Sequence, residues 1–247
     1  MTSAAANRVP AESDWLCESC GYVLNGLPTG GNCPECGQPT RESAGELRHL
    51  PLWEQFGAAS PLRRFLLTTA QVIFQPTRFY RSFATRGSRQ QSARFAHLHW
   101  ALAAVLLGVA GWLHADWFLD LGASMKIGAY VHWYAALPLT FIVYLFLAIT
   151  TRLAARLTTF EATLRGIRLP VSVVRRGLDY HAAHTLPVAL LAFVTILGYR
   201  VALGYSSALM NWGTTYLYTL CVEVIVAAAY LFKTYWIGMR NMMYASR

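Results

Sequence analysis

The sequence predicts an all-α membrane protein: a four-helix transmembrane bundle with interfacial amphipathic helices and a small N-terminal module that contains four cysteines. Three observations lead to this prediction. Only 13% of the residues are charged, about half the share that is usual in a soluble domain. Four apolar runs are each about as long as a bilayer is thick. Two Cys-x-x-Cys pairs precede these runs.

The four apolar runs are the predicted spans of a bundle that covers residues 96–240. Each is about 18 residues or longer, and a helix of that length crosses the hydrocarbon core. The runs lie at residues 98–115, 127–150, 186–203 and 214–232.

Positive charge determines the predicted orientation of the spans. Ten arginines lie in residues 1–97 and six in residues 151–185, whereas the two loops on the other side hold only Lys126 and Arg200. Cytoplasmic loops are enriched in lysine and arginine. We therefore expect a multi-pass protein of the cytoplasmic membrane with both termini in the cytoplasm.

Four segments are predicted ahead of the bundle. Residues 1–14 are small and polar and are expected to be disordered, and residues 15–40 hold the four cysteines. Residues 41–60 form a polar linker, and residues 61–95 form two short amphipathic helices.

The first amphipathic helix is predicted to begin at Ser60-Pro61, an N-cap residue followed by proline at the first helical position. Apolar residues face a polar stripe on this helix, and Gln75-Pro76 ends it. Two interpretations carry equal weight: both helices lie in the lipid headgroup region, or they cap the bundle. The stripe consists of Arg64, Thr68, Gln71 and Gln75.

The cysteines form two similar pairs. Cys17 pairs with Cys20, and Cys33 pairs with Cys36. In each pair the second cysteine is followed directly by a glycine. Two such pairs separated by a short spacer can place four thiolates tetrahedrally around zinc, and cysteines in reducing cytosol are more often metal ligands than disulfides. We therefore expect one zinc ion bound by all four cysteines, with iron as the minor alternative.

The two cysteine pairs resemble the knuckles of the zinc-ribbon and rubredoxin families over about 25 residues. The resemblance implies a structural module that acts as an adaptor. In rubredoxins the same ligands hold redox-active iron, but a longer insert separates the two halves, so zinc is favoured over electron transfer. The ribbon has no basic stripe, which argues against nucleic acid and favours a protein partner. The residues expected to contact that partner are Tyr22, Leu24, Leu27 and Pro28.

Glu223 lies near the middle of the fourth run, where a carboxylate is costly unless it is protonated or paired. Thr140 and Tyr144 of the second run and Thr195 of the third are expected at a similar depth. Two interpretations are open: a proton or substrate site, or a neutral carboxyl group that locks helix packing. The runs contain no second acidic residue, which favours packing.

Four histidines lie at the predicted cytoplasmic ends of the spans. His97 and His99 open the first run, and His181 and His184 precede the third run one turn apart. A second metal site at this interface is geometrically possible. An ordinary interfacial role is the favoured alternative.

The order of a proline–aromatic–basic segment at residues 75–83 and then a hydrophobic bundle is similar to that of Yip-type membrane-domain proteins. The resemblance covers residues 62–240. It implies membrane organisation or trafficking through binding partners, and it carries over no catalytic residues.

Catalytic motifs are lacking: the sequence has no nucleophile elbow, phosphate-binding glycine loop or pair of catalytic carboxylates. The sequence therefore favours a non-enzymatic membrane protein that contacts lipid and recruits a protein partner through its zinc ribbon. The alternative is a small transporter or membrane enzyme that uses Glu223 and the interfacial histidines, with a regulatory ribbon. Rubredoxin-like electron transfer is the third possibility.

Overall fold

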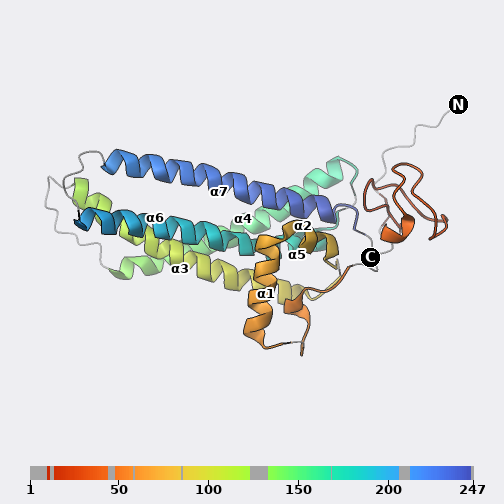
Figure 1. The fold of residues 1–247 in the computed structure, drawn as a ribbon, viewed down its shortest axis with the longest axis horizontal. Helices are drawn as coiled ribbons and strands as arrows, with labels where there is room; N and C mark the ends of the chain where they lie inside the picture. Colours follow the sequence, from red (N-terminus) through yellow and green to blue (C-terminus); the bar gives the residue numbers. More distant parts are fainter. Residues whose placement is uncertain are drawn as a thin grey trace. The chain divides into compact units, whose positions relative to one another are not determined.

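The fold is all-α, as the sequence predicts. A computed structural model describes the protein, and within the residues that it describes there are helices and isolated β-bridges but no strand (Figure 1). The described residues are 10–11, 14–43, 48–57, 59–84, 86–122, 133–167, 169–205 and 212–245. Most of the segment expected to be disordered, at residues 1–14, lies outside them.

The helices follow one another along the chain with short connections. They are η1 (Thr40–Ser43), η2 (Leu52–Glu54), α1 (Pro61–Phe74), α2 (Pro76–Ser82), α3 (Arg89–Gly122), η3 (Trp133–Ala135), α4 (Ala136–Leu164), α5 (Val171–His181), η4 (Ala182–His184), α6 (Thr185–Tyr205) and α7 (Trp212–Met242).

Among the described residues, four helical segments are long and apolar enough to cross a membrane, which agrees with the predicted number. They are Arg89–Asp116, Ala136–Leu164, Val171–Ala202 and Gly213–Met242. Each of these helices continues beyond its apolar run into polar sequence. The start of the predicted second span, residues 127–132, lies outside the described residues.

The chain divides into two compact units, and α3, α4 and α7 each contribute to both. The first unit comprises Met1–Ala96, Thr151–Ala183 and Thr234–Arg247. The second comprises His97–Thr150 and His184–Lys233.

The second unit consists of helical segments that expose apolar side chains. In α3, 44% of the most apolar 18-residue stretch is buried. The share is 6–11% in the other three spans, so α3 is the most enclosed of the four. Leucine, isoleucine, valine and phenylalanine side chains elsewhere face outward, and such surfaces suit lipid rather than water. Examples are Phe141, Ile142 and Phe146 of α4, Leu190 and Val194 of α6, and Val224 and Ile225 of α7.

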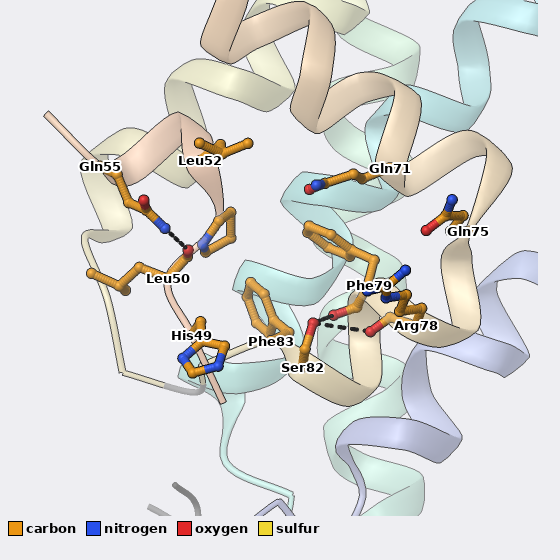
Figure 2. A pocket seen from close by; sticks show the side chains of 11 residues that line it. His49, Leu50, Leu52, Gln55, Gln71, Gln75, Arg78, Phe79, Ser82 and Phe83 are labelled. Atoms are coloured by element: carbon orange, nitrogen blue, oxygen red, sulfur yellow. Dashed lines mark hydrogen bonds between the residues drawn. The ribbon is translucent and has the colours of Figure 1, made fainter. Parts of the chain in front are cut away.

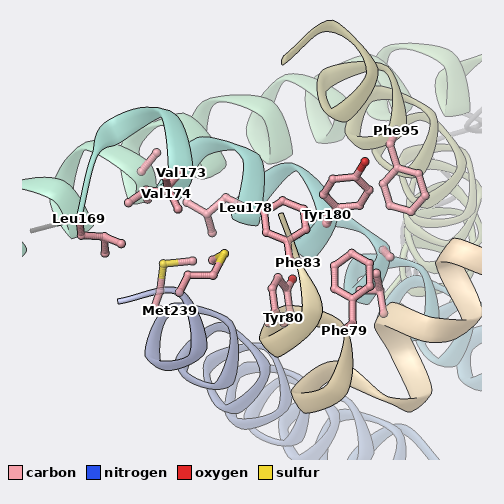
Figure 3. Close-up of a cluster of buried hydrophobic side chains, with 14 of the residues drawn as sticks. Phe79, Tyr80, Phe83, Phe95, Leu169, Val173, Val174, Leu178, Tyr180 and Met239 are labelled. Carbon is pink, nitrogen blue, oxygen red and sulfur yellow. The ribbon is translucent and has the colours of Figure 1, made fainter. Parts of the chain in front are cut away.

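The first unit has an aromatic core centred on α5 (Figure 3). The ring of Tyr180 lies 4.9 Å from that of Phe95 and 5.4 Å from those of Phe79 and Phe83, measured between centroids. The aromatic face of α2 is therefore part of this core. That arrangement agrees with the interpretation of α2 as a cap.

A buried ion pair lies beside the aromatic core. Nη2 of Arg176 is 2.5 Å from Oε1 of Glu54, and both side chains are almost completely buried. The hydroxyl of Tyr180 and the backbone amide of Ser88 also donate to this carboxylate, each at 2.7 Å. These bonds fix η2 and the start of α3 to α5, and losing one partner would leave a buried charge at a cost of about 3–5 kcal/mol.

Helix α1 turns only the first half of its polar stripe towards the protein, since Gln71 and Gln75 are exposed. Arg64 and Thr68 are buried: Nη1 of Arg64 donates to the carbonyl oxygen of Trp53 at 3.2 Å, and Oγ1 of Thr68 accepts from the Trp53 amide at 3.0 Å. Side chains on the opposite side are exposed, Leu62 by 67% and Phe74 by 79%. The predicted start is confirmed, since Oγ of Ser60 accepts from the amide of Arg63.

Candidate metal centre

The two cysteine pairs adopt the same backbone turn. In the first turn the amide of Gly21 donates to the Cys17 carbonyl oxygen, and in the second that of Gly37 donates to Cys33, both at 2.9 Å. The φ angles of the two glycines are +81° and +72°, in the left-handed region that glycine adopts without strain. Each turn is closed by an antiparallel bridge, Leu16 with Val23 and Asn32 with Pro39.

The four sulfur atoms converge on one point. Sγ of Cys17 lies 3.6 Å from that of Cys36, Sγ of Cys20 lies 3.6 Å from that of Cys33, and all four lie within 4.8 Å of one another. A zinc–sulfur bond of about 2.3 Å gives a tetrahedron with edges of about 3.8 Å, whereas a disulfide needs about 2.05 Å. The donor set therefore fits a tetrahedral metal ion. Within the described part of the chain, it is the one group of three or more metal-ligating side chains placed in this way.

The surroundings of the cysteines differ along the site. Cys17 and Cys33 are buried, whereas Cys20 and Cys36 are exposed. A hydrogen bond from the backbone of Gln38 lowers the pKa of the Cys36 thiol to about 7. Desolvation raises the pKa of the Cys20 thiol to about 12, against an opposing hydrogen bond from the backbone of Tyr22. A divalent cation at the centre would favour the thiolate form at all four positions.

The ribbon has a very small apolar core. Leu24 is fully buried with Cys17 and Cys33, and Trp15 and Leu27 pack against them. The prediction that Leu24 contacts a partner is therefore wrong, because the ribbon buries this side chain in its own interior. So small a core supplies little stability, and a metal ion held by the four cysteines would stabilise the fold of this segment.

The first cysteine turn is held by a buried ion pair with Arg48. Nε and Nη2 of Arg48 each lie 2.8 Å from one oxygen of Glu18, and the two side chains are 4% and 15% exposed. The turn also packs against the segment that follows α7: a Cβ atom at Gly21 would lie 2.6 Å from Cε1 of Tyr244.

The remaining donors of Arg48 bind the ends of two helices. Nη1 donates to the carbonyl oxygens of Tyr80 and Phe83, at 3.3 and 2.9 Å, and Nη2 donates to that of Asn241 at 3.0 Å. Arg48 lies in the predicted linker at residues 41–60, and this role was not predicted from the sequence. The single signal was an arginine in the same polar region as the cysteines, which does not indicate a partner.

The predicted intramembrane polar residues separate into three places. Oγ1 of Thr195 donates to Oε1 of Glu223 at 2.6 Å, so α6 and α7 are bonded at that position. Thr140 packs against Gly108 of α3, and the hydroxyl of Tyr144 lies 2.7 Å from Nδ1 of His97.

Three of the four histidines contact a side chain of another helix. His97 contacts Tyr144, Nδ1 of His184 lies 2.7 Å from the hydroxyl of Tyr230, and Nε2 of His181 lies 3.0 Å from Oγ1 of Thr234. His99 is fully buried in α3. Each of these three contacts joins two helices, which agrees with a packing role.

We expect purified protein to carry one zinc ion per chain, and Cys20→Ser to lose at least nine-tenths of it. Removal of one thiolate opens the tetrahedron, and the ribbon has too small a core to stay folded without metal. Elemental analysis measures the zinc content. Hydrogen exchange over residues 15–40 measures the accompanying loss of structure.

Cys221→Ser is the matched control, because Cys221 is an exposed cysteine of α7 outside the cluster. It should keep a full complement of zinc. Equal zinc content in the two variants would contradict the assignment of the site. If the purified protein contained one iron ion per chain and showed a visible charge-transfer band, the site would be assigned as a redox centre instead of a zinc site.

Comparisons of the chain with protein-family models, with curated proteins and with solved structures found no match. The resemblances to zinc ribbons and to Yip-type proteins therefore stay predictions. The site and the fold are interpreted from their own geometry.

Proposed function

We propose that this protein is a non-enzymatic, multi-pass protein of the cytoplasmic membrane whose zinc ribbon recruits a protein partner to the membrane surface. The observation that carries the proposal is the convergence of the four cysteine sulfurs, all within 4.8 Å of one another, in a module that belongs to the first unit. A zinc ribbon is a structural module, and its rigid turns present a defined surface.

The division of the chain supports the proposed orientation. The first unit brings together the three segments that the charge distribution assigns to the cytoplasm. All lysines and arginines except Lys126, Arg200 and Lys233 fall within the ranges of that unit. An even number of spans places the N-terminal segment and the end of α7 on the same side, as the bond from Arg48 to Asn241 requires.

The ribbon offers one free side to a partner. Its first turn is engaged by Arg48 and Tyr244, whereas Pro34, Glu35 and Gly37 of the second turn are exposed. Tyr22 is also exposed, by 39%. The partner surface that we propose is therefore the second cysteine turn together with Tyr22.

The contacts of Glu223 favour packing over transport. Oε1 of the half-buried Glu223 accepts a hydrogen bond from Thr195 of the neighbouring helix, and a bond between two helices is what a packing role requires. Tyr199 of α6 and Thr219 of α7 add a second bond between the same helices at 2.9 Å. Membrane organisation of the Yip type, without catalysis, agrees with these contacts.

The orientation has a direct test. A reporter fused after residue 123 should lie outside the cytoplasm, and fusions after residues 165 and 247 should lie inside it, because the positively charged segments stay on the cytoplasmic side. Paired reporters that are active on opposite sides of the membrane measure the location. A cytoplasmic reporter at residue 123 would contradict the four-span arrangement.

The partner surface is tested by crosslinking the full-length protein in intact membranes and identifying the captured proteins. Wild type and Cys221→Ser should capture the same partner. Cys20→Ser should lose it, because the ribbon unfolds, and Glu35→Lys should weaken capture while zinc stays bound. An identical set of proteins from all four would contradict recruitment through the ribbon.

The transport alternative is tested with Glu223. If the residue only supports packing, a strain that carries Glu223→Gln should grow as the wild type does. Glu223→Leu should lower the free energy of unfolding by about 1 kcal/mol, the scale of an interhelical hydrogen bond in lipid. Thermal unfolding in detergent and growth of a complemented deletion strain measure the two effects. A Glu223→Gln protein that folds normally but has lost its cellular role would establish proton chemistry instead.

A further inference from the structure

A pocket of about 540 Å³ opens between α1, α2 and the segment that contains η2 (Figure 2). Gln71, Gln75 and Arg78 line one side of it, and His49 and Gln55 line the other. Phe79, Phe83, Pro51 and Leu52 supply apolar surface. The volume is in the range of small-molecule sites, about 300–1,000 Å³.

The lining of this pocket favours an anion. Arg78 and His49 line it, and no carboxylate does. Within the described part of the chain Arg78 makes no ion pair, so its guanidinium keeps its donors for a ligand. The amides of Gln71 and Gln75 can donate further hydrogen bonds to oxygen atoms. An arginine beside neutral donors matches a phosphate ester, which guanidinium binds in a bidentate manner.

The neighbouring surface of α1 favours a ligand that is part of a membrane. Leu67 and Phe74 flank Gln71 on the helix and are exposed by 41% and 79%, and Leu62 and Leu66 continue the same exposed face. No aspartate or glutamate occurs between Gln55 and Ala115 in the sequence. An exposed apolar helix face in a segment free of acidic residues is typical of a helix that lies in the headgroup region of an anionic bilayer.

We propose that this pocket binds the phosphate-bearing headgroup of an anionic phospholipid, with α1 lying in the membrane interface beside it. The phosphate pairs with Arg78, the amides of Gln71 and Gln75 bond to ester or hydroxyl oxygens, and the apolar wall contacts the glycerol backbone. The exposed side chains of α1 insert among the first acyl methylenes. The proposal rests on the membrane location proposed above, but it does not depend on zinc or on a protein partner.

The test uses the full-length protein in nanodiscs of phosphatidylcholine that contain phosphatidylglycerol as the minor lipid. After extraction into mild detergent, native mass spectrometry measures retained phosphatidylglycerol, and titration with its dihexanoyl form gives a Kd. Arg78→Gln should raise this Kd about tenfold, or about 1.4 kcal/mol, because it removes the charged donor that pairs with the phosphate. Gln71→Glu, which places a negative charge on the exposed edge of α1, should raise it to a similar extent.

Arg81→Gln is the matched control, since Arg81 is exposed on the same short helix but does not line this pocket. Its Kd should stay within about twofold of wild type. Equal retention by the Arg78 and Arg81 variants would overturn the proposal. If Arg78→Gln fails to fold, as judged by thermal unfolding, the Gln71→Glu variant decides the result.

A second experiment tests whether the ligand of the pocket is a lipid or a soluble phosphate compound. Inorganic phosphate and glycerol phosphate are added at the concentration at which dihexanoyl phosphatidylglycerol saturates the site. Neither should displace the lipid, because they lack the acyl chains that α1 contacts. Displacement by either would assign the pocket to a soluble phosphate ester and overturn the lipid assignment. Both outcomes are independent of zinc content and partner capture, so failure here leaves the proposed function intact.

Discussion

One guanidinium group, that of Arg48, connects the metal-binding module to the rest of the first unit. It pairs with Glu18 through two parallel bonds, and it also donates to carbonyl oxygens at the ends of α2 and α7. Carbonyl groups at a helix C-terminus have no partner within the helix and carry partial negative charge. Arginine can serve both tasks because its five donors lie in a fixed plane, which lysine lacks. The position of the ribbon therefore depends on this side chain, which comes from a stretch with little secondary structure, and on the contact of Gly21 with Tyr244.

The two units satisfy their buried polar groups in different ways. In the first unit a charged pair, Glu54 with Arg176, is surrounded by further donors and by aromatic rings, so the cost of burying it is offset locally. In the second unit the ion pair of Arg200 with Asp116 is partly exposed, and side chains of neighbouring helices bond to one another, as His114 does with Tyr216. Bonds between helices matter in a lipid environment, where an unpaired polar group costs several kcal/mol.

Hydropathy and cysteine spacing were sufficient to predict four helices long and apolar enough to cross a membrane and the convergence of four cysteine sulfurs, because both depend on local sequence. Contacts between distant segments were not predictable. The spacing that predicted a polar stripe on α1 was correct, but only the fold shows that Arg64 faces protein and Leu62 faces outward. Leu24 was predicted to lie on a partner surface but is buried. In a domain this small, the sequence does not show whether a leucine packs in the interior or contacts a partner. The pairing of Glu18 with Arg48 left no periodic signal at all.

The bond from Arg48 to Asn241 joins residues 193 positions apart in the sequence. During synthesis the four cysteines and Glu18 leave the ribosome long before α7 does. The docking site for the first cysteine turn does not exist until α7 has been synthesised, because that site includes the end of this helix. The turn is therefore without this contact during most of the synthesis of the chain. Closure of this long loop distinguishes a finished copy of the chain from an unfinished one.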